Sequence, residues 1–141
     1  MKIAEPMTIS ARVIALELFV KAYLEAMLWS SIDGDTPLDA MFTGEDVQPD
    51  DLAKIIVECG DFIDNYGHLL EEKWASSGHD FWMTRAGHGC GFWDGDWPEH
   101  GDELTKACKT YDNCEPYVGD DGKLCFMWGQ TFEQRQAEEE E

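Results

Sequence analysis

The chain has 141 residues, of which 43% are hydrophobic and 12% aromatic, and its formal net charge is −20. A chain of this size typically forms one domain that buries its own hydrophobic core. So strong a negative charge repels nucleic acids and anionic membranes and attracts basic surfaces. Because phosphate recognition needs clustered Lys and Arg, direct binding of DNA or RNA is excluded as a main function.

The cysteine and hydropathy patterns predict a cytoplasmic protein without a membrane partner. The five cysteines have irregular spacings and follow no secretory leader, so we expect reduced thiols and not a disulfide framework. The apolar residues between Val13 and Trp29 are interrupted by Glu17, Lys21 and Glu25. This interruption excludes a span of about 20 apolar residues in that segment.

The acidity is concentrated in one stretch of the chain. Residues 1–30 are neutral, whereas residues 31–72 hold twelve carboxylates and one lysine, a net charge of −11. Residues 73–128 contribute −5 and residues 129–141 contribute −4. We expect residues 1–128 to form a single acidic α+β domain and residues 129–141 to form a disordered acidic tail.

The first half of the chain predicts two long helices separated by a loop. Apolar residues recur every three or four positions between Ser10 and Ser30, with Ser10 as the N-cap. Glycines and prolines indicate an irregular loop over residues 31–48. Pro49 is well placed in the first turn of a second helix, which we expect to continue to about Trp74.

The second half predicts two β-hairpins on either side of a third helix. Residues 79–85 and 91–94 are rich in aromatic residues and flank a glycine-containing turn. A third helix is expected over about 98–111, followed by a hairpin over 115–128 with its turn at Gly119–Gly122. The fold class is therefore α+β, in the order ααββαββ, with a small antiparallel sheet covered on one face by helices.

The run Asp80–Asp94, DFWMTRAGHGCGFWD, is the most distinctive motif of the chain. With the later run Tyr117–Gly122, YVGDDG, it resembles a family of short acidic proteins encoded by tailed phages, prophages and plasmids. The resemblance covers roughly residues 10–128 and is most specific over 80–94. It implies a mobile-element context and the same α+β fold, but it implies no reaction. Family members usually carry a small residue at the position of Cys90, which argues against a cysteine nucleophile there.

The spacing of ligand-type residues does not support a metal site. There is no Cys-x-x-Cys or His-x₃-His pair, and Cys108 and Cys114 are more widely spaced than typical zinc ligand pairs. The run Asp33–Asp35 begins like a calcium loop, but Gly44 occupies the position that requires a bidentate glutamate. We therefore expect no metal and no cofactor.

The 79–94 segment has an enzymatic and a structural interpretation. A small hydrolase or transferase-like enzyme would use its acid–base groups, which are His79, Asp80, Arg85, His88 and Asp94. In the structural interpretation, Arg85 pairs with Asp94 across the hairpin.

The aromatic residues of the same segment alternate between its two expected faces. Phe81, Met83 and Phe92 are expected in the core. Trp82 and Trp93 would then lie on the opposite face, where they would contact a partner if exposed and belong to the core if covered by helices.

The net charge exceeds the magnitude of about 2–8 that suffices for the solubility of a small domain. Rows of carboxylates on a rigid body resemble duplex DNA to a protein that binds DNA. We therefore expect a non-enzymatic, phage-type inhibitor that binds a basic, nucleic-acid-handling host complex, such as a CRISPR effector, a nuclease or a restriction enzyme.

Two other functions and a homodimer stay open. The alternatives are the small enzyme described above and a phage accessory protein whose target is unrelated to nucleic acids. The predicted partner-binding residues combine the acids of 31–72 with the 79–94 segment. They are Asp33, Asp35, Glu45, Asp46, Asp51, Glu58, Asp61, Glu72, Trp82, Arg85, His88, Trp93 and Asp94.

Overall fold

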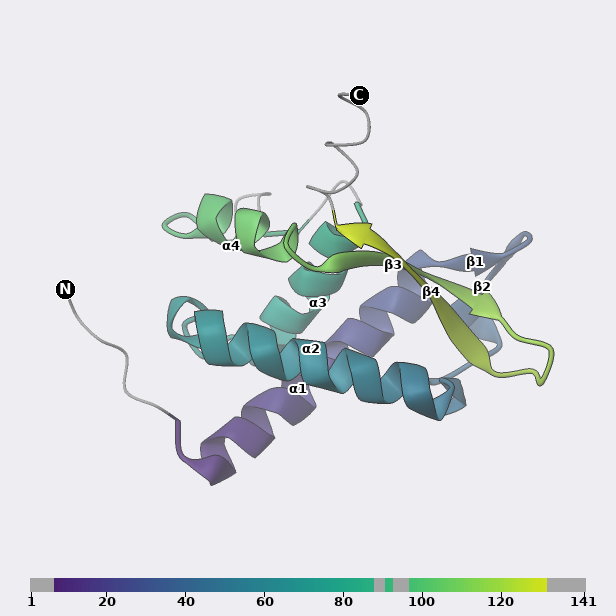
Figure 1. Ribbon diagram of the computed structural model, residues 1–141, viewed down its shortest axis with the longest axis horizontal. Helices are drawn as coiled ribbons and strands as arrows, with labels where there is room; N and C mark the ends of the chain where they lie inside the picture. The colour runs from purple at the N-terminus through teal and green to yellow at the C-terminus, as the bar shows by residue number, and fades with distance from the viewer. Residues whose placement is uncertain (1–6, 88–90, 93–96, 132–141) are drawn as a thin grey trace.

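The computed structural model describes residues 7–87, 91–92 and 97–131 of the chain (Figure 1). Its helices are α1 (Ile9–Ser30), α2 (Pro49–Tyr66), α3 (Trp74–Arg85) and α4 (Gly101–Cys108), with the short 3₁₀ helices η1 (Leu38–Ala40), η2 (Gly44–Asp46) and η3 (Gly67–Leu69). The strands are β1 (Ile32–Asp33), β2 (Thr36–Pro37), β3 (Asp112–Val118) and β4 (Leu124–Thr131). They pair within the described residues as the antiparallel hairpins β1–β2 and β3–β4. The α+β class is confirmed, and the predicted order of elements is approximately correct.

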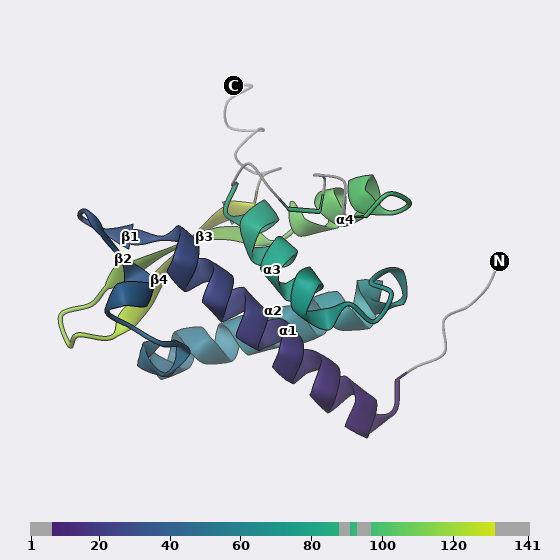
Figure 2. The ribbon, with the colours of Figure 1, turned by 180° about the vertical axis from the view of Figure 1, so that it is seen from behind.

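Helix α1 is the element on which the others pack. The predicted N-cap Ser10 is wrong, because the helix begins at Ile9 and Thr8 caps it by accepting a hydrogen bond from the Ala11 amide at 3.1 Å. Figure 1 shows α2 crossing in front of α1, and Figure 2 shows α3 lying beside α1 when the molecule is seen from behind. A Cβ atom at Gly78 of α3 would lie 2.0 Å from the carbonyl oxygen of Phe19, so glycine is required where α1 and α3 meet.

An aromatic cluster fills the space between the three longer helices. The rings of Phe62 on α2 and Phe81 on α3 stack with their centroids 4.5 Å apart, and Phe19 of α1 lies 5.7 Å from Phe81. Phe92 adds a second stacked ring at 5.7 Å from Phe62. Phe81, Met83 and Phe92 are all buried, as the sequence predicted. Burial of these large apolar surfaces is the main favourable contribution to folding.

The predicted hairpin over residues 79–94 is wrong, because residues 79–85 belong to helix α3. Gly78, Phe81, Trp82 and Arg85 recur at helical spacing, and all four are buried. A short aromatic run does not by itself distinguish a strand from a buried helix, and here packing against α1 decides. Gly91 and Phe92 form a bend and a turn instead of a strand, while residues 88–90 and 93–96 lie outside the described residues.

The second helix is shorter than expected because the chain reverses direction after Tyr66. Gly67 begins η3, and the next turn places Glu71 and Glu72 in the left-handed region, with φ values of 54° and 60°. Such values are uncommon for residues other than glycine. Trp74, the predicted end of the second helix, is instead the first residue of α3, which returns along α1.

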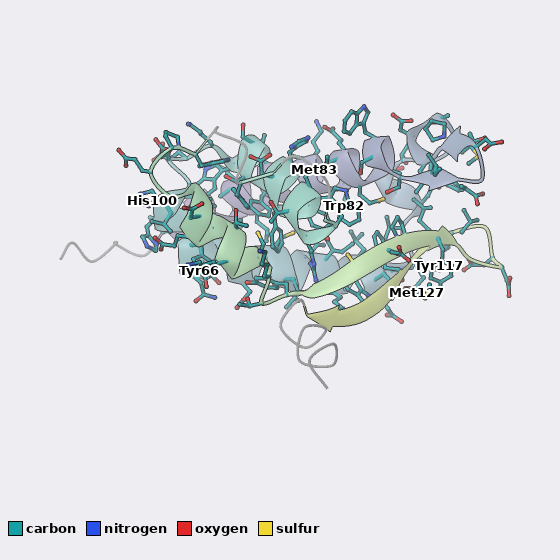
Figure 3. The ribbon with its side chains drawn as sticks, turned by 90° about the horizontal axis from the view of Figure 1, so that it is seen from above. Tyr66, Trp82, Met83, His100, Tyr117 and Met127 are labelled. Carbon is teal, nitrogen blue, oxygen red and sulfur yellow. The ribbon has the colours of Figure 1, made fainter. Side chains whose placement is uncertain are left out.

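The predicted hairpin at 115–128 is present and longer than expected. Strands β3 and β4 are joined by a turn in which the Gly119 amide donates to the Lys123 carbonyl at 2.8 Å, and Gly122 has a φ of +80°. Strand β4 continues to Thr131, and residues 132–141 of the predicted tail lie outside the described residues. The helices lie on one side of this hairpin (Figure 3).

The loop expected over 31–48 contains short regular elements. Besides the hairpin β1–β2, it forms η1 and η2. The Leu38 amide donates to the Ser31 carbonyl at 2.9 Å, and the Gln48 amide donates to the Leu124 carbonyl of β4 at 2.7 Å. The first bond closes the β1–β2 hairpin on Ser31, the C-cap of α1, and the second attaches the end of the segment to β4.

Candidate protein-binding surface

The carboxylates of one end of the molecule are exposed and unpaired. Hairpin β1–β2, η1, η2 and the first turn of α2 lie together at this end, on the right in Figure 1. The exposed acids that they carry are Asp33, Asp35, Asp39, Glu45 and Asp50, which we call the acidic end. In the described part of the chain, none of these side chains forms an ion pair or accepts a hydrogen bond. Their charges are therefore directed to solvent.

Short-range hydrogen bonds hold the acidic end in a defined conformation. The Thr43 hydroxyl accepts from the Glu45 amide at 3.3 Å, while the Asp46 carboxylate accepts from the Thr43 amide at 2.7 Å. This reciprocal capping box uses the carboxylate of Asp46, so this predicted contact residue has a structural role. Val47 then forms a bridge to Leu124, which ties η2 to β4.

Asp51 is a structural residue and not an exposed contact. One of its carboxylate oxygens accepts from the Phe126 amide at 3.0 Å, and the other accepts from the Trp128 indole at 2.9 Å. The side chain therefore joins the start of α2 to strand β4. Its predicted place in an exposed acidic row is wrong, because the hairpin covers this part of the helix.

Glu58 and Arg85 form an ion pair in the interior. The guanidinium of Arg85 donates to Glu58 Oε1, and the two side chains are 1% and 15% exposed. Glu58 Oε2 is buried, makes no hydrogen bond among the described residues and faces the Lys54 ammonium at 3.4 Å. The expectation that Glu58 is exposed for a partner is therefore wrong, and Arg85 is likewise inaccessible. Asp94, the predicted partner of Arg85, lies outside the described residues.

Aromatic rings and polar groups surround the Arg85 guanidinium. The guanidinium carbon lies 5.3 Å from the ring centroid of Trp128 and 5.5 Å from that of Phe81, distances typical of cation–π contacts. The Tyr23 hydroxyl accepts from it at 3.5 Å. Burial opposes the positive charge, but Tyr23, Cys114 and Glu58 outweigh that effect and raise the pKa of Arg85. The cluster stabilises the junction of α1, α2, α3 and the β3–β4 hairpin.

The remaining predicted acids of α2 and its neighbouring turn are exposed, but they do not extend the acidic end as one row. Asp61 accepts a hydrogen bond from the Tyr111 hydroxyl at 2.6 Å. Burial, followed by this bond to Asp61, raises the pKa of Tyr111. Glu72 lies in the turn between η3 and α3. Because Asp51 and Glu58 are engaged between them, the acids of this region fall into separate groups.

Trp82 belongs to the core and not to a contact surface. It is 1% exposed, and its indole donates to the Ser30 hydroxyl at 2.8 Å (Figure 3). Its ring packs edge-on against Tyr23 with the centroids 5.4 Å apart. Of the two alternatives for Trp82, the core position is therefore correct, and its place among the predicted partner-binding residues assumed the alternating faces of a strand. Trp93 and His88 lie outside the described residues.

An apolar groove between α1 and α2 was not found from the sequence. It encloses about 930 Å³, and its residues come from one side of α1, the start of α2 and the segment around η2. Its floor consists of Val13, Leu16, Val20, Leu24, Leu52 and Ile56, which together we call the α1–α2 groove. At its end, a Cβ atom on Gly44 would lie 3.1 Å from Leu24 Cδ1, so the loop approaches α1 closely there.

The sequence did contain a signal for this groove. Helix α1 carries apolar residues on more than one side: Val13, which lines the groove, is 48% exposed, while Ile9 and Ile14, which lie outside it, are 85% and 58% exposed. A helix that serves only the core has one apolar stripe and a polar opposite face. The excess of apolar residues indicates a second surface of α1 that faces something other than the core.

Comparisons with protein-family models, with curated protein sequences and with solved structures find no match.

Among the predicted catalytic groups, His79 and Asp80 are in contact. His79 Nδ1 lies 3.0 Å from Asp80 Oδ1, and the Trp97 indole donates to Asp80 Oδ2 at 2.6 Å. The carboxylate is buried and anchors Trp97, whereas Arg85 contacts Glu58 on α2. Asp80 and Arg85 thus have structural roles, and the His79–Asp80 contact is the place where two described members of the predicted enzyme site meet.

The three buried thiols are poor nucleophiles. Cys59, Cys108 and Cys114 are buried, and burial raises the pKa of each one. Cys125 is partly buried, and all four are free. A protonated thiol in an apolar environment is unreactive. Cys90 lies outside the described residues.

No group of three or more His, Cys, Asp or Glu side chains within the described residues is arranged to hold a metal ion. None of the helices in these ranges is both long and apolar enough to cross a bilayer.

Proposed function

We propose that this protein is a non-enzymatic inhibitor that binds a basic, nucleic-acid-handling protein in the cytoplasm of a bacterial host. The resemblance of residues 80–94 to proteins of phages and plasmids makes a CRISPR effector, a nuclease or a restriction enzyme the expected class of target. The observation that carries the proposal is the acidic end, whose carboxylates have no partner in the described part of the chain.

Unpaired carboxylates favour binding by electrostatic attraction. A protein that binds DNA presents clustered Lys and Arg, and it releases bound ions when acidic groups replace DNA phosphates. Long-range attraction accelerates association but contributes modestly to final affinity. The acidic end would therefore select basic partners, and apolar contacts would provide most of the affinity.

The defined conformation of the acidic end favours specific recognition of a partner over nonspecific electrostatic attraction. The buried side chain of Leu38 and the bridge of Val47 to Leu124 hold its backbone on the body of the protein. Carboxylates in fixed positions lose less conformational entropy on binding than those of a mobile tail.

The enzymatic alternative receives less support from the geometry. Asp80 is bound by the Trp97 indole, and Arg85 is buried beneath aromatic rings. Groups held by such contacts are not available to a substrate. His79, which remains 44% exposed beside Asp80, is the group that an enzymatic function would require.

The proposal is tested by comparing two sets of three neutral substitutions. The first set, Asp33→Asn, Asp35→Asn and Asp39→Asn, removes charge from the acidic end. The second, Glu71→Gln, Glu99→Gln and Asp102→Asn, removes the same charge elsewhere, so both proteins change from −20 to −17. Each is immobilised and exposed to nuclease-treated bacterial lysate at about 50 and about 200 mM salt.

The unmodified protein should retain a basic, nucleic-acid-binding protein that is released by the higher salt and by duplex DNA. The first set should lose that protein, and the second should keep it. Retained partners that are neither basic nor nucleic-acid-binding, or binding that ignores salt, would contradict the proposal and favour an accessory protein with another target.

A further inference from the structure

The α1–α2 groove exposes apolar surface that the described residues leave uncovered. Val13 on α1 is 48% exposed and Ile56 on α2 is 38% exposed, although both belong to the floor. Exposed apolar area costs free energy in water, and contiguous patches of it mark interaction sites. The groove therefore has the character of an unoccupied binding surface.

The dimensions of the groove match a helix. Its α1 side extends from Val13 to Leu28, which corresponds to about 22 Å of helix axis at the standard rise. A helix of about four turns has the same length. Two helices that diverge from a crossing commonly accept the apolar face of a third helix, whose contacts recur at positions i, i+3, i+4 and i+7.

One edge and one end of the groove carry carboxylates. Glu17, Lys21 and Glu25 follow one edge at steps of four residues, and Glu45 stands at the end near η2. All four are exposed, and within the described residues none of them forms an ion pair. Three carboxylates and one ammonium beside an apolar floor complement a helix that has an apolar face bordered by Lys and Arg.

The same charges disfavour a second copy of this chain in the groove. Two α1 helices that paired about a two-fold axis near Lys21 would place Glu17 of each copy opposite Glu25 of the other, and the two lysines opposite each other. Like charges in contact across an interface are strongly unfavourable. The two bodies would also repel each other, since each has a net charge of −20.

We propose that the α1–α2 groove binds a basic amphipathic helix of the target protein, with its apolar face on Val13, Val20, Leu24 and Ile56 and its cations near Glu17, Glu25 and Glu45. This inference rests on the proposed function and specifies the element of the target that is recognised. The acidic end attracts the partner, and the groove provides the apolar contact.

The probe is a fluorescein-labelled peptide of about 16 residues with Leu at positions i, i+3, i+4 and i+7 of each helical repeat and Lys or Arg elsewhere. A peptide of the same composition in scrambled order has the same charge without the apolar face. Fluorescence anisotropy measures the affinity of both peptides for the full chain. The ordered peptide should bind at least about tenfold more tightly, because the scrambled peptide cannot place its leucines in the groove.

The decisive test compares each groove variant with a control variant at the next residue of the same helix. All of these substitutions leave the net charge unchanged. Val13→Gln and Ile56→Gln alter the groove, whereas Ile14→Gln and Val57→Gln alter neighbours that are 58% and 69% exposed outside it. Each groove variant should bind the ordered peptide about tenfold more weakly than the unmodified chain does. The affinity of each control variant should stay within about twofold of that of the unmodified chain. Circular dichroism of each variant verifies that the fold is retained.

Three results would overturn the inference. Equal binding of the two peptides, or equal losses in groove and control variants, would show that surface charge alone attracts them. A chain that sediments as a dimer, and as a monomer after Ile56→Gln, would identify a second copy as the occupant.

The failure of this inference and that of the proposed function are distinguishable. If the lysate experiment succeeds and the groove variants behave like their controls, the inhibitor function stands and the groove is not its contact. If the peptide binds the groove and no nucleic-acid-binding protein is retained from lysate, the groove binds helices but the proposed class of target is wrong.

Discussion

The acidic end and the Arg85 cluster use the same side chain, a carboxylate, in opposite environments. At the acidic end, Asp33, Asp35 and Asp39 are exposed and lack partners among the described residues. In the cluster, Glu58 is bound to Arg85, and at the start of the same helix Asp51 is bound to strand β4. The comparison shows that a high count of acids does not measure the size of an acidic surface. Some of the acids hold the fold together, and the others are free to act on a partner.

The largest effect on stability is expected from removing the Arg85 guanidinium. Arg85→Met should lower the free energy of unfolding by about 3 kcal/mol or more, because it leaves Glu58 partly buried without its main cation. Urea denaturation measures the change. The double variant Arg85→Met with Glu58→Leu should recover much of the loss, since it removes the unpaired charge as well. If the double variant were no more stable than the single one, Glu58 would not be the important partner.

A second comparison uses two neighbouring acids at the start of α2. Asp51→Ala should cost about 2 kcal/mol, because the Phe126 amide and the Trp128 indole both lose their acceptor. Asp50→Ala, one residue earlier at an exposed position, should cost less than about 1 kcal/mol through the helix dipole alone. Chemical denaturation of the two variants provides the measurement. Equal losses would mean that Asp51 does not join α2 to the hairpin.

The buried groups around Arg85 predict a fall of stability at alkaline pH. Burial raises the pKa of Cys59 and Cys114 above the usual thiol value of 9.0, so the folded chain keeps protons that the unfolded chain releases. Their stabilising contribution is therefore complete below about pH 9 and decreases as pH rises above it. Urea midpoints at about pH 7 and about pH 10 would show the decrease. Replacing both cysteines by Ala should reduce the difference, and an unchanged difference would exclude these thiols as its source.

The smallest expected effect concerns the acidic end. Its unpaired carboxylates repel one another, so added salt should stabilise the protein by screening them. We expect the melting temperature to rise by about 4 °C between low salt and about 0.5 M NaCl. The three substitutions Asp33→Asn, Asp35→Asn and Asp39→Asn should reduce this rise without lowering stability at low salt. A melting temperature that does not respond to salt would indicate that these charges do not interact.

The fold was predictable where a signal lies within a single element. The periodicity between Ser10 and Ser30 predicted α1 almost to the residue, and the turn at Gly119–Gly122 predicted the second hairpin. Residues 79–85 were misassigned because an aromatic run fits a strand and a buried helix equally well. Gly78 distinguishes the two, but its role depends on contact with Phe19, which is distant in the sequence.

The sequence indicated which stretch of the chain carries the candidate surface. It did not indicate which acids of that stretch are exposed. The concentration of acids in residues 31–72 is a property of the sequence, and the exposure of Asp33, Asp35 and Glu45 agrees with the predicted surface. The engagement of Glu58 with Arg85 was not predictable, because the two residues are 27 positions apart and belong to different helices. No pattern within either helix indicates that pairing.

The sequence by itself determined the charge, the α+β class and the strongest helix and hairpin, because these depend on composition and on neighbours along the chain. The tertiary structure alone decided which acids are free, that Trp82 lies in the core, and that α1 and α2 leave an apolar groove between them. The physical reason is that the burial of a side chain depends on which two elements pack against each other. A side chain becomes exposed or enclosed only when another part of the chain arrives beside it.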